Sequence, residues 1–212
     1  MKTIVVKDLN EASSKCFNFI DEELKKTSDK LNIALTGGRF GKFFASYITS
    51  MSIPTKRLRL FQTDERLVAL DNNESIQGML LEKLMDEENI DTYFFNLEHS
   101  PEIIADIMEK SINDLGLKFL DIVILSLGED GHLAGNFKNS ISLNEKCTFT
   151  NNAPKPPKKR ISFSIDWLIR SKIVIIVALG NEKEKAIQDL LSGTGAFPSI
   201  NLSSKNIVLL RD

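Results

Sequence analysis

Two almost wholly apolar runs in the second half of the chain limit the possible fold most strongly. Residues 119–127 read FLDIVILSL, and residues 173–180 read IVIIVALG. Runs of this kind are typical of central parallel strands that are covered on both faces. Each run leads directly into a polar segment, GEDGH in the first case and GNEK in the second. The pattern therefore predicts an α/β sheet whose strand ends carry the loops that bind ligands.

Hydrophobic periodicity elsewhere predicts an alternation of strands and helices. Further strands are expected at residues 1–7, 31–36, 58–61, 93–97, 160–164 and 206–210. Helices are expected at residues 9–30, 42–50, 75–85, 101–112, 166–172 and 181–192. Pro101 fits a first helical turn, and Asn181 is predicted as an N-cap with Glu184 in a capping-box position. We expect one α/β domain over residues 1–212, a doubly wound, mostly parallel, Rossmann-like sheet with helices on both faces.

Composition excludes several classes of protein. The 212 residues include 27 Lys and Arg against 29 Asp and Glu, so no basic excess favours a nucleic-acid partner. The longest apolar run is about a third of a membrane-spanning helix, and residues 1–7 lack the features of a signal peptide. Cys16 and Cys147 form no CxxC pair and suggest no disulfide framework. We expect a soluble, cytoplasmic protein with neither a membrane nor a nucleic-acid partner.

The segments TGGRFG, TDER, GEDGH and GNEK all fall at predicted strand ends. Because the carboxyl ends of parallel strands share one edge of the sheet, these segments should meet at one site. In TGGRFG, Gly37 and Gly38 would let the backbone approach an anion such as a phosphate at a helix start. A tight turn between strand and helix is the alternative. The loop lacks the Gly-Lys-Ser/Thr of a Walker A motif and the first glycine of GxGxxG.

Charged residues in these loops suggest recognition of a sugar phosphate. Asp64 would hydrogen-bond hydroxyl groups, while Arg66 would meet an oxyanion or a phosphate. The proline-rich segment 154–160 would hold Lys155 and Arg160 rigidly, and Lys183 follows another strand end. Solvated turns and an ordinary exposed lysine are the alternatives for these positions.

GEDGH holds one of only two histidines in the chain. His132 has the type of side chain that takes a proton from water near neutral pH, and Asp130 would orient its imidazole. A loop histidine that caps a helix is the alternative, and His99 is expected at the surface. Isolated histidines and cysteines offer no zinc spacing, so no metal or other cofactor is expected, although sequence leaves open a carboxylate-bound magnesium ion.

Taken in order, these motifs resemble those of 6-phosphogluconolactonases, within the group that includes glucosamine-6-phosphate deaminase/isomerase. The resemblance covers nearly the whole chain and rests on TGGRFG, TDER, GEDGH, APKPPKKRISFS, GNEK and FPSINL near Pro198. It implies hydrolysis of 6-phospho-glucono-1,5-lactone to 6-phosphogluconate in the pentose phosphate pathway without metal or cofactor. The implied catalytic residues are His132, Asp130 and Arg66. The implied phosphate site comprises Gly37, Gly38, Lys155, Arg160 and Lys183.

Some positions depart from the family pattern. Arg39 and Gly41 stand where Ser and Pro are usual, which predicts either a looser loop or an added cation at the phosphate. Ile76 replaces an Asn, and Asn136-Phe137-Lys138 replaces the usual Ser-Leu-Phe-Pro. A deaminase would carry Asp-Glu-Tyr at residues 64–66 and a Glu at Phe137, so deamination ranks second. A sugar-phosphate-binding protein without activity is a further alternative, and sequence leaves monomer and homodimer open.

Overall fold

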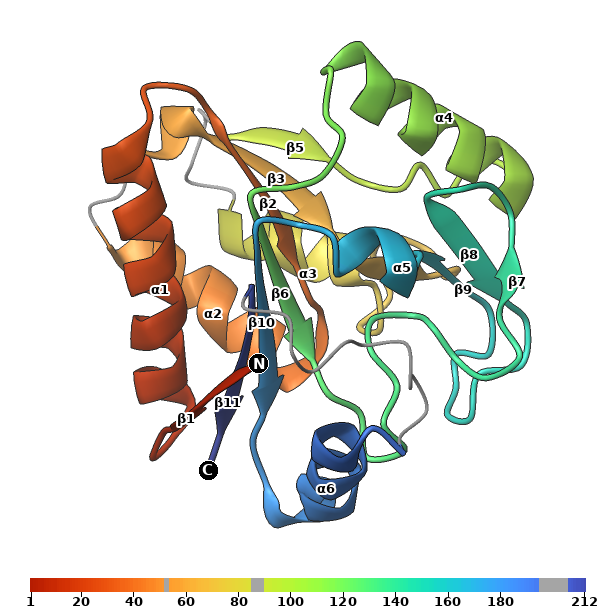
Figure 1. Ribbon diagram of the computed structural model, residues 1–212. Coiled ribbons are helices and arrows are strands. Elements are labelled where there is room, and N and C mark those ends of the chain that lie inside the picture. Colours follow the sequence, from red (N-terminus) through yellow and green to blue (C-terminus); the bar gives the residue numbers. More distant parts are fainter. Residues whose placement is uncertain (52–53, 85–89, 195–205) are drawn as a thin grey trace.

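The computed structural model describes residues 1–51, 54–84, 90–194 and 206–212. Seven strands form one sheet in the order β1-β11-β10-β6-β2-β3-β5, and every pairing between them is parallel (Figure 1). Their bounds are β1 Lys2–Val5, β2 Leu31–Leu35, β3 Leu58–Gln62, β5 Asp91–Tyr93, β6 Ile122–Ser126, β10 Ile173–Ala178 and β11 Ile207–Arg211. All carboxyl ends therefore lie along one edge of this sheet, as the sequence predicts.

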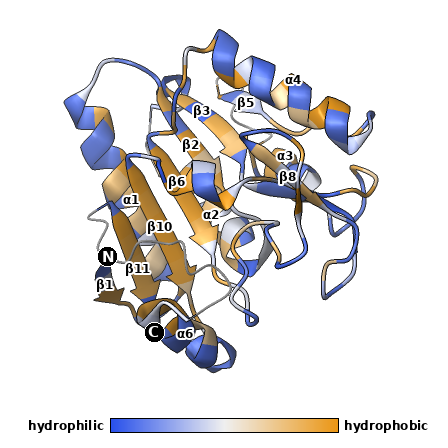
Figure 2. Cartoon of the chain, turned by 45° about the vertical axis from the view of Figure 1, so that its right-hand side comes forward, coloured by the Kyte–Doolittle hydropathy of each residue, from blue (hydrophilic) through white to orange (hydrophobic). Residues whose placement is uncertain are grey.

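Helices cover both faces of the parallel sheet. One face packs against α1 (Leu9–Lys26), α2 (Gly38–Ser50) and α3 (Ile76–Leu84), and the other against α4 (Pro101–Asp114), α5 (Ile165–Leu168) and α6 (Glu184–Ser192). Successive strand residues point to opposite faces, so Ile175 of β10 joins the first core and Ile176 the second. Figure 2 shows the central strands as hydrophobic along their length. The predicted doubly wound α/β fold is confirmed.

A second, antiparallel sheet extends the domain in the order β4-β9-β8-β7. It consists of β4 (Asp64–Arg66), β7 (Ile141–Ser142), β8 (Cys147–Thr150) and β9 (Arg160–Phe163), with β7, β8 and β9 beside α4 in Figure 1. Of this sheet the sequence predicts only β9, as the strand expected at residues 160–164; the other three strands have two to four residues and are too short to show a pattern. Ile161 and Phe163 of β9 join the core that lies beneath α4, so the two sheets share one apolar interior.

Several predicted boundaries are wrong. Asn181 lies in a 3₁₀ turn (Asn181–Lys183), and the Glu184 carboxylate binds Arg211 and Gln188 and forms no capping box. Helix α1 ends at Lys26, before the predicted Lys30, because Thr27 is already extended on the way to β2. The strand expected at residues 93–97 lies earlier, at β5. The first-turn position of Pro101 is confirmed.

Two predicted features, Met85 at the end of one helix and the FPSINL segment, lie outside the described residues. Both cysteines are buried and free. No helix within the described part of the chain is long and apolar enough to cross a membrane.

Candidate active site

A cavity of about 460 Å³ lies at the carboxyl edge of the parallel sheet. Residues from all four predicted strand-end segments line it, together with the proline-rich loop, so their expected convergence is confirmed. The sequence-predicted residues that line it are Gly37, Gly38, Asp64, Arg66, Asp130, His132, Lys155, Arg160 and Lys183. Arg39 is not among the lining residues and borders neighbouring surface hollows instead. Its charge nevertheless contributes to the lowered pKa of Lys183, which does line the cavity, so Arg39 as an added cation at the phosphate stays a prediction.

The glycine loop is tightly packed where it joins β2 to α2. A Cβ atom at Gly41 would lie 1.9 Å from the carbonyl oxygen of Thr36, which only a glycine avoids. A Cβ at Gly37 would lie 2.5 Å from the side chain of Ile76, which itself lines the cavity. Gly38 has a φ of 70°, in the left-handed region that glycine tolerates. Gly41 thus lets the helix start lie directly against the Thr36 carbonyl.

The GEDGH loop holds His132 against Asp130 after the end of β6. The Nδ1 atom of His132 is hydrogen-bonded to Oδ1 of Asp130. The other ring nitrogen, Nε2, takes no part in this bond and is the one that could accept a proton. Burial would raise the pKa of Asp130, but the hydrogen bond and charge of His132 outweigh it and hold that pKa below its usual value. The His132 side chain is 30% exposed, so water reaches it. The pair has the arrangement of a base and its orienting acid.

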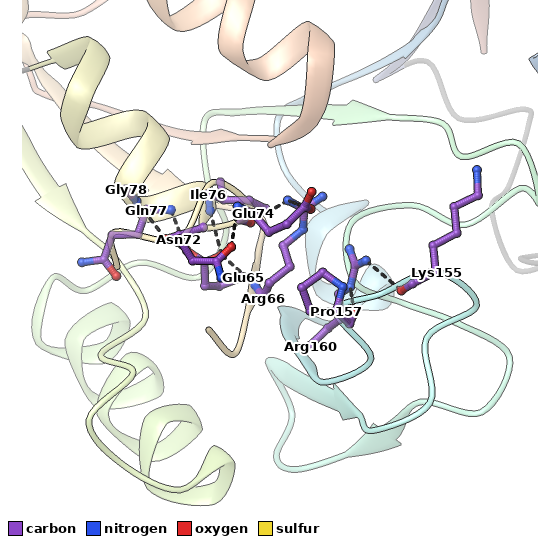
Figure 3. A network of polar contacts seen from close by, with 11 residues as sticks. Glu65, Arg66, Asn72, Glu74, Ile76, Gln77, Gly78, Lys155, Pro157 and Arg160 are labelled. Carbon is purple, nitrogen blue, oxygen red and sulfur yellow. Dashed lines mark hydrogen bonds and ion pairs between the residues drawn. The ribbon is translucent and has the colours of Figure 1, made fainter. Parts of the chain in front are cut away.

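Glu65 is fully buried and serves the fold of the site. Its carboxylate accepts backbone N–H bonds from Arg66 (2.6 Å), Ile76 (2.8 Å) and Gln77 (2.5 Å; Figure 3). It also accepts a side-chain bond from Gln62 (3.0 Å). Burial outweighs these bonds and raises the pKa of Glu65. Glu65 thus ties β4 to the start of α3, which explains its place in the DER segment.

Two arginines face each other across the β4–β9 ladder, where Arg66 pairs with Arg160. Arg66 donates to the backbone carbonyl of Glu74 at 2.7 Å and forms a 3.4 Å ion pair with the Glu74 carboxylate. Arg160 donates to the carbonyls of Pro157 and Lys155, and Figure 3 shows both arginines on neighbouring strands. Burial and the charge of Arg66 lower the pKa of Arg160. Paired cations of this kind favour an anionic ligand.

Two lysines reach the cavity from other loops. Lys183 donates to the hydroxyl of Ser126 at 3.4 Å, and burial lowers its pKa despite the nearby carboxylates of Glu182, Glu129 and Asp212. Lys155 forms a 2.9 Å ion pair with Glu129, and both side chains are exposed. Lys183 is therefore the more enclosed of the two cations.

Asp64 is almost fully buried and its carboxylate accepts a 2.8 Å hydrogen bond from the Thr63 hydroxyl. It also lines the cavity. Among the described residues, no group of three or more His, Cys, Asp and Glu side chains is arranged to hold a metal ion.

Comparison with known proteins decides the family. The model of the family described as glucosamine-6-phosphate isomerases/6-phosphogluconolactonase matches residues 7–207. The chain belongs to this family. A relative from Borreliella burgdorferi, named 6-phosphogluconolactonase, is 28% identical over 200 residues and the match covers 89% of this chain and 84% of the relative.

Solved structures of the family share the fold. The 6-phosphogluconolactonase from Trypanosoma cruzi superposes with a TM-score of 0.88 at 25% identity, covering 100% of this chain and 94% of that chain. A monomeric glucosamine-6-phosphate deaminase superposes with a TM-score of 0.80 at 19% identity, covering 100% of this chain and 97% of the other. At that identity the second likeness concerns the fold alone, so the fold does not separate the two reactions of the family.

Some cavity residues were not predicted as site residues from sequence. Glu74, Ser126 and Glu129 line the cavity, although Glu74 belongs to no recognised motif. The sequence could have pointed to Ser126, because it is a polar residue near the end of a buried apolar run. The sequence marks Phe137 as a departure from the family pattern, at the position where a deaminase would carry a Glu, but not as a site residue. Its ring centroid lies 4.7 Å from that of His132, a contact between residues five apart that only the folded loop reveals.

Proposed function

We propose that this protein hydrolyses 6-phospho-D-glucono-1,5-lactone to 6-phospho-D-gluconate, as a 6-phosphogluconolactonase of the oxidative pentose phosphate pathway. The observation that carries the proposal is the His132–Asp130 pair in a cavity that also contains Arg66, Arg160 and Lys183. A base with its orienting acid suits attack by water on a carbonyl, and the cations suit a phosphorylated substrate. The names of the relatives agree with this reaction.

In the proposed mechanism, Nε2 of His132 accepts a proton from water as the water oxygen bonds to C1 of the lactone. Asp130 holds the imidazole through Nδ1 and stabilises the imidazolium that forms. Arg66 lies close to the carbonyl oxygen and stabilises the negative charge of the tetrahedral intermediate. The bond from C1 to the ring oxygen then breaks and the ring oxygen takes up a proton to become a hydroxyl; this proton balances the one that His132 accepted, so one water is added in total and the imidazole returns to its neutral form. Water is the only co-reactant.

The phosphate supplies binding away from the reacting carbon. We place it against the start of α2 at Gly37 and Gly38 and against the cations of Lys155, Arg160 and Lys183. Asp64 would accept a hydrogen bond from a sugar hydroxyl. Holding the phosphate orients the ring so that the carbonyl lies next to the base, and this orientation lowers the barrier to attack.

Glucosamine-6-phosphate deamination is the second candidate, and the surroundings of His132 favour it less. The position that would carry an acidic partner in a deaminase is Phe137, whose ring packs against the imidazole of His132. Arg66 likewise occupies the position of a deaminase tyrosine. A binding protein without activity is the third candidate, because the same groups would hold a sugar phosphate without turning it over.

The deciding experiment is a lactonase assay on freshly generated 6-phosphogluconolactone, coupled to 6-phosphogluconate dehydrogenase. His132→Ala protein serves as the background, because this lactone also hydrolyses unaided. We expect wild type to exceed this background clearly, while His132→Ala still binds 6-phosphogluconate. A wild-type rate equal to background would refute the proposed function, and ammonia release from glucosamine 6-phosphate would then be tested. Loss of both binding and turnover in His132→Ala would mean that His132 is structural.

A further inference from the structure

The ring of Phe137 contacts two charged or chargeable groups that come from separate elements. Its centroid lies 4.7 Å from the imidazole centroid of His132, with the ring planes inclined at 34°. The guanidinium carbon of Arg160, on β9, lies 5.9 Å from the same centroid. Phe137 also lines the cavity. A single aromatic ring therefore lies next to the proposed base and to one of the proposed phosphate-binding cations.

Hydrogen bonds hold the backbone that carries this ring. Asn136, immediately before it, is buried, and its side-chain amide donates to the Ser162 hydroxyl (3.1 Å) and the Phe163 carbonyl (2.9 Å). The Phe137 backbone N–H donates to the Ser140 hydroxyl at 2.9 Å. Ala134, with a φ of 52°, lies in a turn in which the Asn136 N–H donates to the Leu133 carbonyl at 3.1 Å. These contacts fasten Phe137 to the small sheet that carries Arg160.

An aromatic face attracts cations within about 6 Å of its centroid. Arg160 is a permanent cation, and His132 becomes one when it takes the proton from water. Phe137 thus favours one position for the guanidinium and supports the imidazole ring by packing. We propose that Phe137 is a positioning residue that fixes the His132 imidazole relative to the Arg160 guanidinium, so that carbonyl and phosphate are engaged together. This inference rests on the proposed lactonase function.

The test compares Phe137→Leu with Phe137→Tyr and with Phe119→Leu. Leucine removes the aromatic face, and tyrosine keeps it. Phe119 is 41% exposed and is not among the residues lining the cavity, so it provides a matched control for the Phe-to-Leu change. We would measure kcat and KM for the lactone above the unaided rate. The Kd for 6-phosphogluconate would be measured by calorimetry, with each change placed in the His132→Ala background.

For Phe137→Leu we expect kcat to fall about tenfold or more, because a misplaced base loses orientation. KM, and the Kd in the His132→Ala background, should rise about threefold to tenfold through loss of the Arg160 contact. The binding stoichiometry should stay at the wild-type value. Phe137→Tyr should remain within about threefold of wild type in all three constants, and Phe119→Leu should match wild type.

The outcomes separate a positioning role from a merely structural one. Unchanged KM and Kd in Phe137→Leu, with fewer active molecules and a lower melting temperature, would overturn the proposal. Equal losses in the Tyr and Leu variants would also overturn it, because the ring would then not be the cause. If wild type shows no lactonase activity, the proposed function fails by itself. The calorimetric comparison would still show whether Phe137 acts on Arg160.

Discussion

Gly128→Ala should disable the proposed base without unfolding the protein. A Cβ atom at Gly128 would lie 2.1 Å from Nδ1 and 2.2 Å from Cε1 of His132, and 2.8 Å from Oδ1 of Asp130. Carbon atoms in ordinary contact are at least about 3.5 Å apart, so the imidazole would have to retreat by roughly 1.3 Å. Such a movement breaks the hydrogen bond to Asp130 and takes Nε2 away from the attacking water.

A misplacement of about 1 Å at a reacting group lowers the rate about 100-fold, which corresponds to about 2.7 kcal/mol of activation free energy. We therefore expect kcat of Gly128→Ala to fall about 100-fold in the coupled lactonase assay, while 6-phosphogluconate binding weakens far less. The loop is partly exposed, so the melting temperature should change little.

Gly116→Ala is the matched control. Gly116 has a φ of 68°, and a Cβ there would meet no atom within 4 Å, so the change adds backbone strain of about 1 kcal/mol without a clash. Gly116 follows α4 and is not among the cavity-lining residues, so kcat should stay at the wild-type value. A Gly128→Ala enzyme within about threefold of wild-type kcat would refute the reasoning, because the loop would then have accommodated a methyl group without disturbing the base.

Three further predictions concern the residues that support the site. Glu65→Gln should lower the free energy of unfolding by about 2–4 kcal/mol in urea titrations. The Glu65 carboxylate now accepts hydrogen bonds from backbone N–H groups, and the NH2 group of a glutamine would face such donors without being able to accept from them. An unchanged urea midpoint would contradict this. Burial lowers the pKa of Lys183, and its cation is the form that binds phosphate. Binding of 6-phosphogluconate should therefore weaken as pH rises from about 7 to 10, starting below the pH at which an exposed lysine titrates. Lys183→Arg should keep its affinity for 6-phosphogluconate over this range. If wild type and Lys183→Arg lost affinity in parallel, the pH dependence would come from a group other than Lys183. Asn136→Ala should lower the unfolding free energy by about 2–4 kcal/mol, because it removes buried hydrogen bonds to Ser162 and the Phe163 carbonyl; a loss below about 1 kcal/mol in thermal denaturation would argue against this account.

Sequence reasoning succeeded where the physical signal is local and repeated. The apolar runs around Ile122–Ser126 and Ile173–Ala178 predict buried strands because both of their faces must be covered by helices. Parallel strands then bring their loops to one edge, and so the lining of the cavity by Gly38, His132 and Lys183 followed from topology alone.

Other features could not be predicted from the sequence, because they depend on contacts with residues far away in the chain. The small sheet pairs residues 64–66 with 160–162, across almost a hundred positions, and although a strand is expected at 160–164, its partner of three residues is too short to show periodicity. Asn181 has the side chain of an N-cap, yet the turn at Gly180 puts it inside a 3₁₀ segment. In both cases tertiary contacts, and not local preference, select the backbone conformation.

The amino-acid sequence by itself determined the α/β class, the edge of the sheet at which a ligand would bind, and the residue types gathered there. Only the tertiary structure decided which contacts the individual side chains make. It made Glu65 a buried tie to α3 and brought Phe137 against His132 and Arg160. The reason is that hydrophobic pattern and strand order depend on neighbouring residues, whereas hydrogen bonds and ring contacts depend on ångström-scale placement by the whole core.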